Sequence, residues 1–148
     1  MKITNETNRC MDFEVARVLL VDDNPTSRLT LQTVLEASGY HVDSAASAAE
    51  AVGKLDEQEY QLVLSDLQME SPQAGLKVLA HARMMAYKPA TAIVTTYQNS
   101  QPQHSKPEKY ARTLVKPEDV PGLLAKVANL ISERAARKVQ REMRHATS

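Results

Sequence analysis

The sequence has few of the features found in cross-linked, membrane-spanning or strongly charged proteins. Cys10 is its only cysteine, so an intramolecular disulfide and a thiolate metal cluster are both excluded. Apolar runs are short, and the run from Val18 to Val21 is far below the length needed to cross a bilayer. Eighteen basic and eighteen acidic residues give a net charge of zero. No global attraction to nucleic acid or to an anionic membrane follows from this balance.

The N-terminal segment also lacks the apolar stretch of a secretory signal, because residues 1–14 are mostly polar. We therefore expect a soluble cytoplasmic protein in which Cys10 stays reduced. The 148 residues, 43% of them hydrophobic, are enough for one domain with a single core. We predict an N-terminal tail over residues 1–14, a domain over 15–131 and a charged helical extension over 132–148.

Four short apolar runs predict buried strands. None of them alternates polar with apolar residues, which is typical of strands covered on both faces of a parallel sheet. A weaker run from Tyr40 to Asp43 does alternate and indicates an edge strand. The four runs are Val18–Val21, Leu62–Leu64, Ala92–Val94 and Leu114–Val115.

Helical patterns occupy most of the segments between these runs. Asn24-Pro25 suits the start of a helix, since proline is favoured in the first turn. Residues 47–50 form a capping box with serine first and glutamate last. A further apolar pattern runs from Leu76 to Met85, and a last helix is predicted to begin near Pro117. Alternating strands and helices predict an α/β domain with a parallel sheet.

One helix of this alternation is doubtful. Residues 96–111 contain two prolines and show no apolar periodicity. We therefore predict an atypical or missing fourth helix between the last two strands.

Polar side chains follow four of the predicted strands. Asp22 and Asp23 follow the first strand, and Asp66 ends the third; Thr95 follows the fourth, and Lys116 the fifth. Functional groups of an open parallel sheet gather at the carboxyl ends of its strands. A single such residue is most simply a solvated strand end. Four strand ends that all carry polar groups indicate a site.

Such a site favours a divalent cation and phosphoryl chemistry. Neighbouring carboxylates repel each other by roughly 1–4 kcal/mol per pair at a surface-like dielectric. One of them tends to take up a proton unless a cation intervenes. Mg²⁺ binds one or two protein carboxylates and keeps several waters. Phosphoryl transfer then needs mainly positioning and neutralisation of the phosphoryl oxygens.

The segments VLLVDDNPTSR, VLSDLQM, AIVTTY and LVKP resemble the receiver domain of two-component response regulators. The resemblance extends over about residues 17–131. It implies a flavodoxin-like, doubly wound fold of five parallel strands in the order 2-1-3-4-5, flanked by helices. It also implies that Asp66 is phosphorylated, that Asp23 binds Mg²⁺ directly, and that Asp22 contributes to the metal site through water or second-sphere contacts.

The same resemblance assigns supporting roles and partners. Asp66 and the backbone carbonyl of Gln68 complete the protein's ligands to Mg²⁺, while Thr95 and Lys116 contact the phosphoryl group. The donor is a histidine kinase or a histidine phosphotransfer protein, and the signal passes to an unknown protein target. The domain slowly loses its own phosphoryl group and is not a turnover enzyme. A homodimer is possible, and no nucleic-acid or membrane partner is expected.

Three departures from the family pattern bear on mechanism. The loop after Met69 has one residue more than usual, which affects the loop's shape but not the acceptor. Thr113 stands where the family carries an aromatic switch residue, and the 97–110 segment is atypical. These last two departures favour an alternative, a pseudo-receiver that is not controlled by phosphorylation. An aspartyl-phosphate hydrolase of the haloacid dehalogenase type fits poorly, because Gln68 stands where such enzymes have a second aspartate.

The charged C-terminal extension has three interpretations. Its residues have high helix propensity and form only a weak apolar stripe, which is typical of a solvated helix. A helix that associates with a partner or a second copy is also compatible with the pattern. Nucleic-acid binding is the weakest interpretation, since the basic residues have no interleaved aromatic side chains.

Overall fold

The computed structural model describes residues 15–66, 72–94, 112–114 and 120–147. Its centre is a sheet of five strands in the order β2-β1-β3-β4-β5, and all neighbouring strands run parallel. The predicted fold class and strand order are confirmed, and the alternating segment lies at the sheet edge as β2. The strands are β1 (Arg17–Val21), β2 (His41–Ala45), β3 (Leu62–Asp66), β4 (Ala90–Val94) and β5 (Arg112–Leu114).

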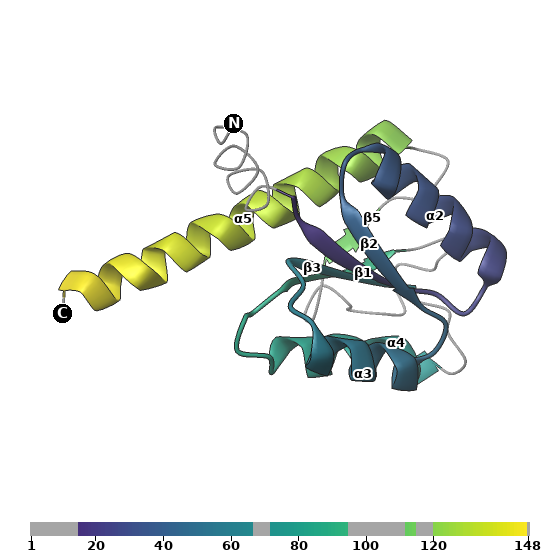
Figure 1. The fold of residues 1–148 in the computed structure, drawn as a ribbon, viewed down its shortest axis with the longest axis horizontal. Coiled ribbons are helices and arrows are strands. Elements are labelled where there is room, and N and C mark those ends of the chain that lie inside the picture. Colours follow the sequence, from purple (N-terminus) through teal and green to yellow (C-terminus); the bar gives the residue numbers. More distant parts are fainter. Residues whose placement is uncertain (1–14, 67–71, 95–111, 115–119, 148) are drawn as a thin grey trace, which may run out of the picture.

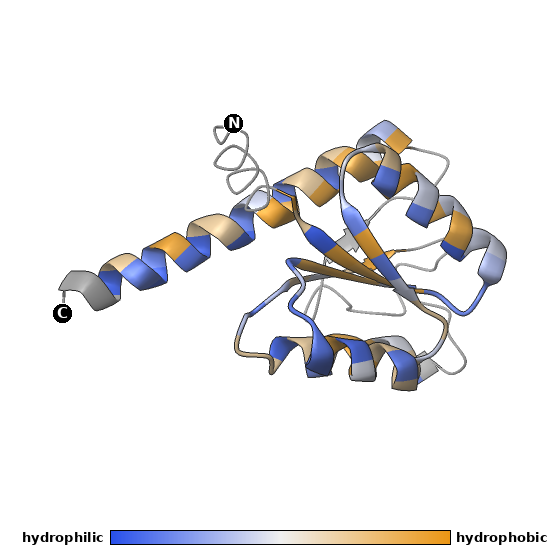
Figure 2. Ribbon diagram, in the orientation of Figure 1, coloured by the Kyte–Doolittle hydropathy of each residue, from blue (hydrophilic) through white to orange (hydrophobic). Residues whose placement is uncertain are grey.

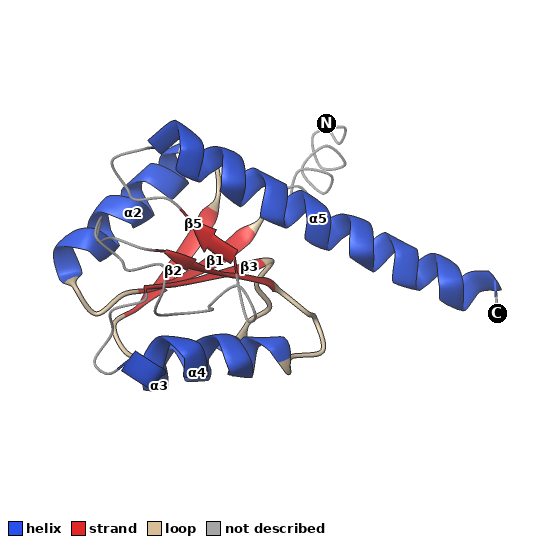
Figure 3. Cartoon of the chain, turned by 180° about the vertical axis from the view of Figure 1, so that it is seen from behind, coloured by secondary structure: helices blue, strands red, loops and turns tan. Residues whose placement is uncertain are grey.

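Helices cover both faces of the sheet. Helices α2 (Pro25–Ala37) and α5 (Val120–Thr147) lie on one face, and α3 (Ala48–Glu57) and α4 (Pro72–Arg83) lie on the other (Figure 1; Figure 3). This three-layer arrangement is the doubly wound form expected for a parallel sheet. Residues 95–111, where the fourth helix is predicted to be atypical or missing, lie outside the described residues.

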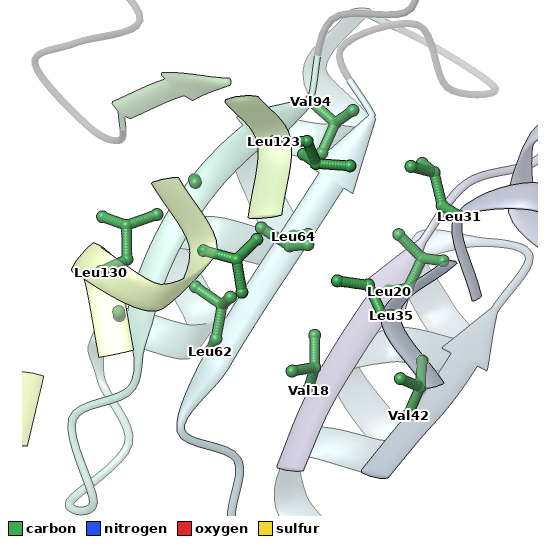
Figure 4. Packing of buried hydrophobic residues seen from close by; sticks show 13 residues of the cluster. Val18, Leu20, Leu31, Leu35, Val42, Leu62, Leu64, Val94, Leu123 and Leu130 are labelled. Carbon is green, nitrogen blue, oxygen red and sulfur yellow. The ribbon is translucent and has the colours of Figure 1, made fainter. Parts of the chain in front are cut away.

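Two hydrophobic clusters, one on each face, form the core. Successive side chains of a strand point to opposite faces, so Leu20 of β1 packs in one cluster and Leu19 in the other. Figure 4 shows side chains of β1 and β2 facing α2, and side chains of β3 and β4 facing α5. Figure 2 shows hydrophobic residues concentrated in the central strands, whereas the edge strand β2 and the projecting part of α5 carry many hydrophilic residues. Each fully buried leucine contributes about 1.5–3 kcal/mol.

Polar caps determine where α2 and α3 begin. The Asn24 side chain accepts a hydrogen bond from the Ser27 N–H at 3.0 Å, and Pro25 occupies the first turn. At α3, Ser47 Oγ accepts from the Glu50 N–H at 3.1 Å. The Glu50 carboxylate reaches back and accepts from the Ala46 N–H at 2.9 Å. The predicted capping serine is therefore confirmed.

Helix α5 is much longer than the sheet that it covers. Its first half buries Leu123, Val127 and Leu130, whereas residues 135–144 are all exposed. The 28-residue helix therefore projects beyond the domain (Figure 1). The proposed boundary between residues 131 and 132 falls inside this continuous helix and stays a prediction. In the described part of the chain, no helix combines the length and apolarity needed to cross a membrane.

The prediction for β5 is correct only in part. The strand begins at Arg112, two residues before the apolar run that predicted it. Its backbone pairs with β4, and Thr113 lies beside Ile93. The start of α5 predicted near Pro117 lies outside the described residues.

Candidate metal centre

Three carboxylates meet at the carboxyl ends of β1 and β3. One oxygen each from Asp22, Asp23 and Asp66 lies within 4.8 Å of the other two. The strand register explains this, because Val21 pairs with Ser65 and the next residue on each strand is an aspartate. Strand β1 lies between β2 and β3, so the chain connections diverge to opposite sides at this point of the sheet. Ligands of open α/β sheets bind at such a switch point.

Asp22 is held rigidly at the end of β1. It is 1% exposed, and its backbone N–H donates to the carbonyl of Ala45 on β2 at 3.0 Å. Its Oδ1 atom accepts a hydrogen bond from the Asn24 N–H at 2.9 Å. Arg28 Nη1 donates to the backbone carbonyl of Asp22 at 2.8 Å. The start of α2 therefore fixes both the main chain and the side chain of this acid.

The other two carboxylates differ in exposure. Asp66 is 5% exposed and lies on β3, with its backbone beside Val94 of β4. Asp23 is exposed to solvent. A ligand that enters the cluster from solvent therefore meets Asp23 first and finds Asp66 at the base.

The electrostatics of the cluster favour a bound cation. Burial raises the pKa of the Asp22 carboxyl above its ordinary value of 3.8, and the negative charge of Asp23 adds to the shift. The hydrogen bond from Asn24 and the neighbouring carboxyl group of Asp66 oppose the shift in the pKa of Asp22. Within the described part of the chain, no donor reaches the buried Oδ2 atom of Asp22. An oxygen-only donor set with a buried oxygen open to coordination fits a hard divalent cation such as Mg²⁺.

The structure brings together three of the predicted site residues and does not describe the others. Asp22, Asp23 and Asp66 converge, as the strand-end argument requires. Gln68, Thr95 and Lys116 lie outside the described residues, and so does the loop that follows Met69. Their predicted roles stay predictions.

Sequence reasoning missed one contributor to this site. No motif of the sequence singles out Arg28, yet its guanidinium donates a hydrogen bond to the backbone carbonyl of Asp22. The spacing of Arg28 from Pro25 could have indicated this role, because a residue three positions after Pro25 is about one helical turn along α2. Such a residue can reach back to the strand end that precedes the helix.

Comparison with protein families gives one match that covers most of the chain. The model of the response regulator receiver domain matches residues 18–128. The gliding motility regulatory protein of Myxococcus xanthus is 38% identical over 78 residues, which are 53% of this chain and 10% of that protein. The alginate biosynthesis transcriptional regulatory protein AlgB of Pseudomonas putida is 40% identical over 81 residues, 55% of this chain and 18% of that protein. The chain therefore spans a small part of these relatives.

Solved structures of similar proteins agree with the fold. The response regulator TrrA of Thermotoga maritima, in complex with Mg²⁺-BeF, has a TM-score of 0.67 and 29% identity. The alignment covers 78% of this chain and 99% of that protein. A CheY-like receiver domain of Methanospirillum hungatei has a TM-score of 0.71 and 25% identity, and the alignment covers 83% and 98% of the two chains.

Proposed function

This chain belongs to the response regulator receiver domain family of two-component signalling, and we propose that Asp66 is its phosphoacceptor. The observation that carries this proposal is the convergence of Asp66 with Asp22 and Asp23 at the β1/β3 switch point. Asp66 ends a strand whose five residues are all buried, so its position is fixed by the sheet. A carboxylate held in this way is suited to attack a phosphorus atom that approaches the carboxyl ends of the strands from solvent.

The proposed transfer uses Asp66 as the nucleophile. A carboxylate oxygen of Asp66 attacks phosphorus, an O–P bond forms, and the P–N bond of a phosphohistidine donor breaks. The imidazole nitrogen leaves with the electron pair and then takes up a proton. The negative charge on the phosphoryl oxygens stays in place throughout this step, so the site has to tolerate it.

Asp22, Asp23 and Asp66 would hold the cation that makes this possible. Bound Mg²⁺ would supply positive charge to the phosphoryl oxygens and offset the repulsion between the carboxylates. Support for its presence here comes from the oxygen donor set and from the buried Oδ2 atom of Asp22. We assign direct binding of Mg²⁺ to Asp23 because this residue lies on the solvent-exposed side of the carboxylate cluster. The rigidly held Asp22 would order the coordinated water.

The remaining roles rest on the family resemblance. We propose that the carbonyl of Gln68 completes the ligand set, that Thr95 donates its hydroxyl to the phosphoryl group, and that Lys116 forms an ion pair with it. The ends of β3, β4 and β5 are neighbours in the sheet, which supports this grouping.

The proposed role in the cell is phosphorylation-controlled signalling in the cytoplasm. A histidine kinase or a histidine phosphotransfer protein would supply the phosphoryl group, and a partner protein would read the phosphorylated state. The chain would return to its resting state by losing its own phosphoryl group, without turnover of a substrate. Thr113 lacks the ring of the usual aromatic switch, so the output would depend on other groups.

Intact mass spectrometry tests this proposal directly. We would incubate the protein with Mg²⁺ and acetyl phosphate and compare it with the Asp66→Asn variant. A phosphoryl adduct on the parent that is absent from Asp66→Asn and is suppressed by EDTA is the expected result. An unmodified parent under conditions that label a known receiver would instead identify a pseudo-receiver.

A further inference from the structure

A second polar site lies at the amino ends of the strands, opposite the carboxylate cluster. A cavity of about 360 Å³ opens between the first residues of β4, the turn that precedes them and the middle of α5. Ala90 begins β4 and Asp66 ends β3, so the cavity and the carboxylate cluster lie at opposite strand ends. Five of its ten lining residues are cationic and one is acidic. The cations are Arg83, Lys88, Arg134, Arg137 and Arg141.

Arg134 is a structural part of this cavity. Only 9% of the residue is exposed, although it belongs to the charged part of α5. Its Nε atom donates to the carbonyl of Lys88 at 3.0 Å, and Nη2 donates to the carbonyl of Tyr87 at 2.7 Å. These bonds use two of the five N–H donors of the guanidinium. Arg134 therefore joins the turn before β4 to α5 and fixes the shape of the cavity.

The same turn contains an unusual backbone conformation. Lys88 has a φ of 49°, and it precedes Pro89. A lysine rarely adopts a positive φ, and a following proline restricts its backbone further. Such conformations persist where surrounding contacts enforce them, and they cluster at functional sites. Here two hydrogen bonds hold the residue: its carbonyl accepts from Arg134 Nε, and its N–H donates to the carbonyl of Met85 at 3.0 Å.

The cavity concentrates positive charge in a protein whose net charge is zero. Five cations and one acid leave a formal excess of +4 at its wall. Burial lowers the pKa of Arg134, and the charges of Arg141 and Arg137 lower it further. Within the described part of the chain, Arg137 and Arg141 form no ion pair. The repulsion among these cations is relieved when an anion binds between them.

We propose that this basic cavity binds a small anion that carries two or more phosphate groups, such as a nucleoside diphosphate or triphosphate. Guanidinium groups bind phosphate through paired hydrogen bonds, and four of the five cations are arginines. The volume lies at the lower end of the range of about 300–1,000 Å³ for small-ligand pockets. Pro89, Ala90 and Leu130 add an apolar wall against which a base or sugar can pack.

The geometry favours a compact ligand over a nucleic-acid strand. The cations reach the cavity from α4, from the turn before β4 and from α5, and so surround a volume rather than line a track. A strand would have to extend from Arg137 and Arg141 to the basic residues of α5 that lie outside the cavity. Lys138 is one of these residues and does not line the cavity.

Calorimetric titration with inorganic pyrophosphate and with ATP tests this inference. The full chain would be titrated in the absence of divalent metal, so that the carboxylate cluster does not recruit a metal–nucleotide complex. We expect saturable one-to-one binding. The double variant Arg137→Gln/Arg141→Gln should weaken it by about tenfold or more, because charge-assisted hydrogen bonds are lost.

A matched control removes the same number of charges elsewhere. The variant Lys126→Gln/Lys138→Gln changes two exposed lysines of α5 outside the cavity, and it should weaken binding by less than about twofold. Amide shifts in NMR spectra should move at Lys88, Ala90 and Thr91 and not at Asp22 or Asp23.

Three results would overturn the inference. The first is the absence of saturable binding to both pyrophosphate and ATP. The second is an equal loss of affinity in the two double variants, which would indicate unspecific attraction. The third is a single-stranded RNA that binds more tightly than ATP and loses affinity equally in both variants, because this would assign the basic residues to a nucleic-acid surface.

Discussion

The backbone N–H of Asn24 donates to the Oδ1 atom of Asp22 at 2.9 Å, while the Asn24 side chain caps α2 by accepting from the Ser27 N–H. One residue thus uses its main chain to orient an acid of the metal centre and its side chain to begin a helix. Because two separate groups carry these functions, mutation can separate them.

Asn24→Ala should destabilise the fold without disabling the metal centre. The substitution removes the capping oxygen, which costs about 1 kcal/mol, but it keeps the N–H that binds Asp22. Urea unfolding would report the free-energy loss, and a Mg²⁺ titration should give a dissociation constant close to that of the parent. Asn24→Ser retains a capping oxygen and should recover most of the stability. A large loss of Mg²⁺ affinity in Asn24→Ala alone would contradict this separation.

The metal-free protein should lose stability as the pH rises through the titration of Asp22. The folded-state pKa of this carboxyl lies above 3.8, so the folded state holds its proton more tightly than the unfolded state. The cost of ionising Asp22 is therefore absent well below pH 3.8, grows above it, and is complete above the raised folded pKa. Thermal melts in EDTA from acidic to neutral pH would follow this loss.

Asp22→Asn isolates this contribution from other titrating groups. The amide retains an oxygen that can accept from the Asn24 N–H, and it carries no charge. In EDTA at neutral pH the variant should melt at a higher temperature than the parent, and the difference should disappear toward acidic pH. A variant that melts below the parent at neutral pH would show that the buried charge is already compensated.

Mg²⁺ should stabilise the folded parent protein through the exposed ligand Asp23. A cation that binds only the folded state adds about 2.7 kcal/mol when its concentration is roughly 100 times the dissociation constant. Melting temperatures with and without Mg²⁺ should therefore separate for the parent and converge for Asp23→Asn, which lacks the exposed ligand. Glu57→Gln removes an exposed acid at the end of α3 and should respond to Mg²⁺ like the parent.

Arg134 should matter for folding far more than its neighbours on α5. Arg134→Gln removes hydrogen bonds to the carbonyls of Tyr87 and Lys88, and we expect a loss of about 1–3 kcal/mol. Arg137→Gln changes an exposed side chain and should stay within about 0.5 kcal/mol of the parent. Equilibrium denaturation measures both, and equal effects would contradict the anchoring role of Arg134.

Local pattern was enough to predict most of the sheet and the cluster. The buried runs are continuous because both faces of the strands are covered, and the end of each run placed Asp22, Asp23 and Asp66 at one edge. Neighbouring aspartates look alike in a sequence, however. Only the strand geometry shows that Asp22 is buried and Asp23 is exposed.

The burial of Arg134 was beyond sequence reasoning for a physical reason. The arginine lies in a charged segment that resembles a solvated helix. Its burial depends on two carbonyls that come from a turn 46 and 47 residues away in the chain. Helical periodicity carries no information about such partners. The basic cavity depends on the tertiary contact between α5 and the turn before β4.

The length of α5 has a mechanical consequence. A helix of 28 residues spans about 42 Å, and its buried residues lie between Leu123 and Arg134. A small change in the tilt of α5 against the sheet therefore produces a larger displacement at the C-terminal end of the helix. A rearrangement of the core residues that contact Leu123 or Val127 is thereby amplified at the C-terminal end of α5.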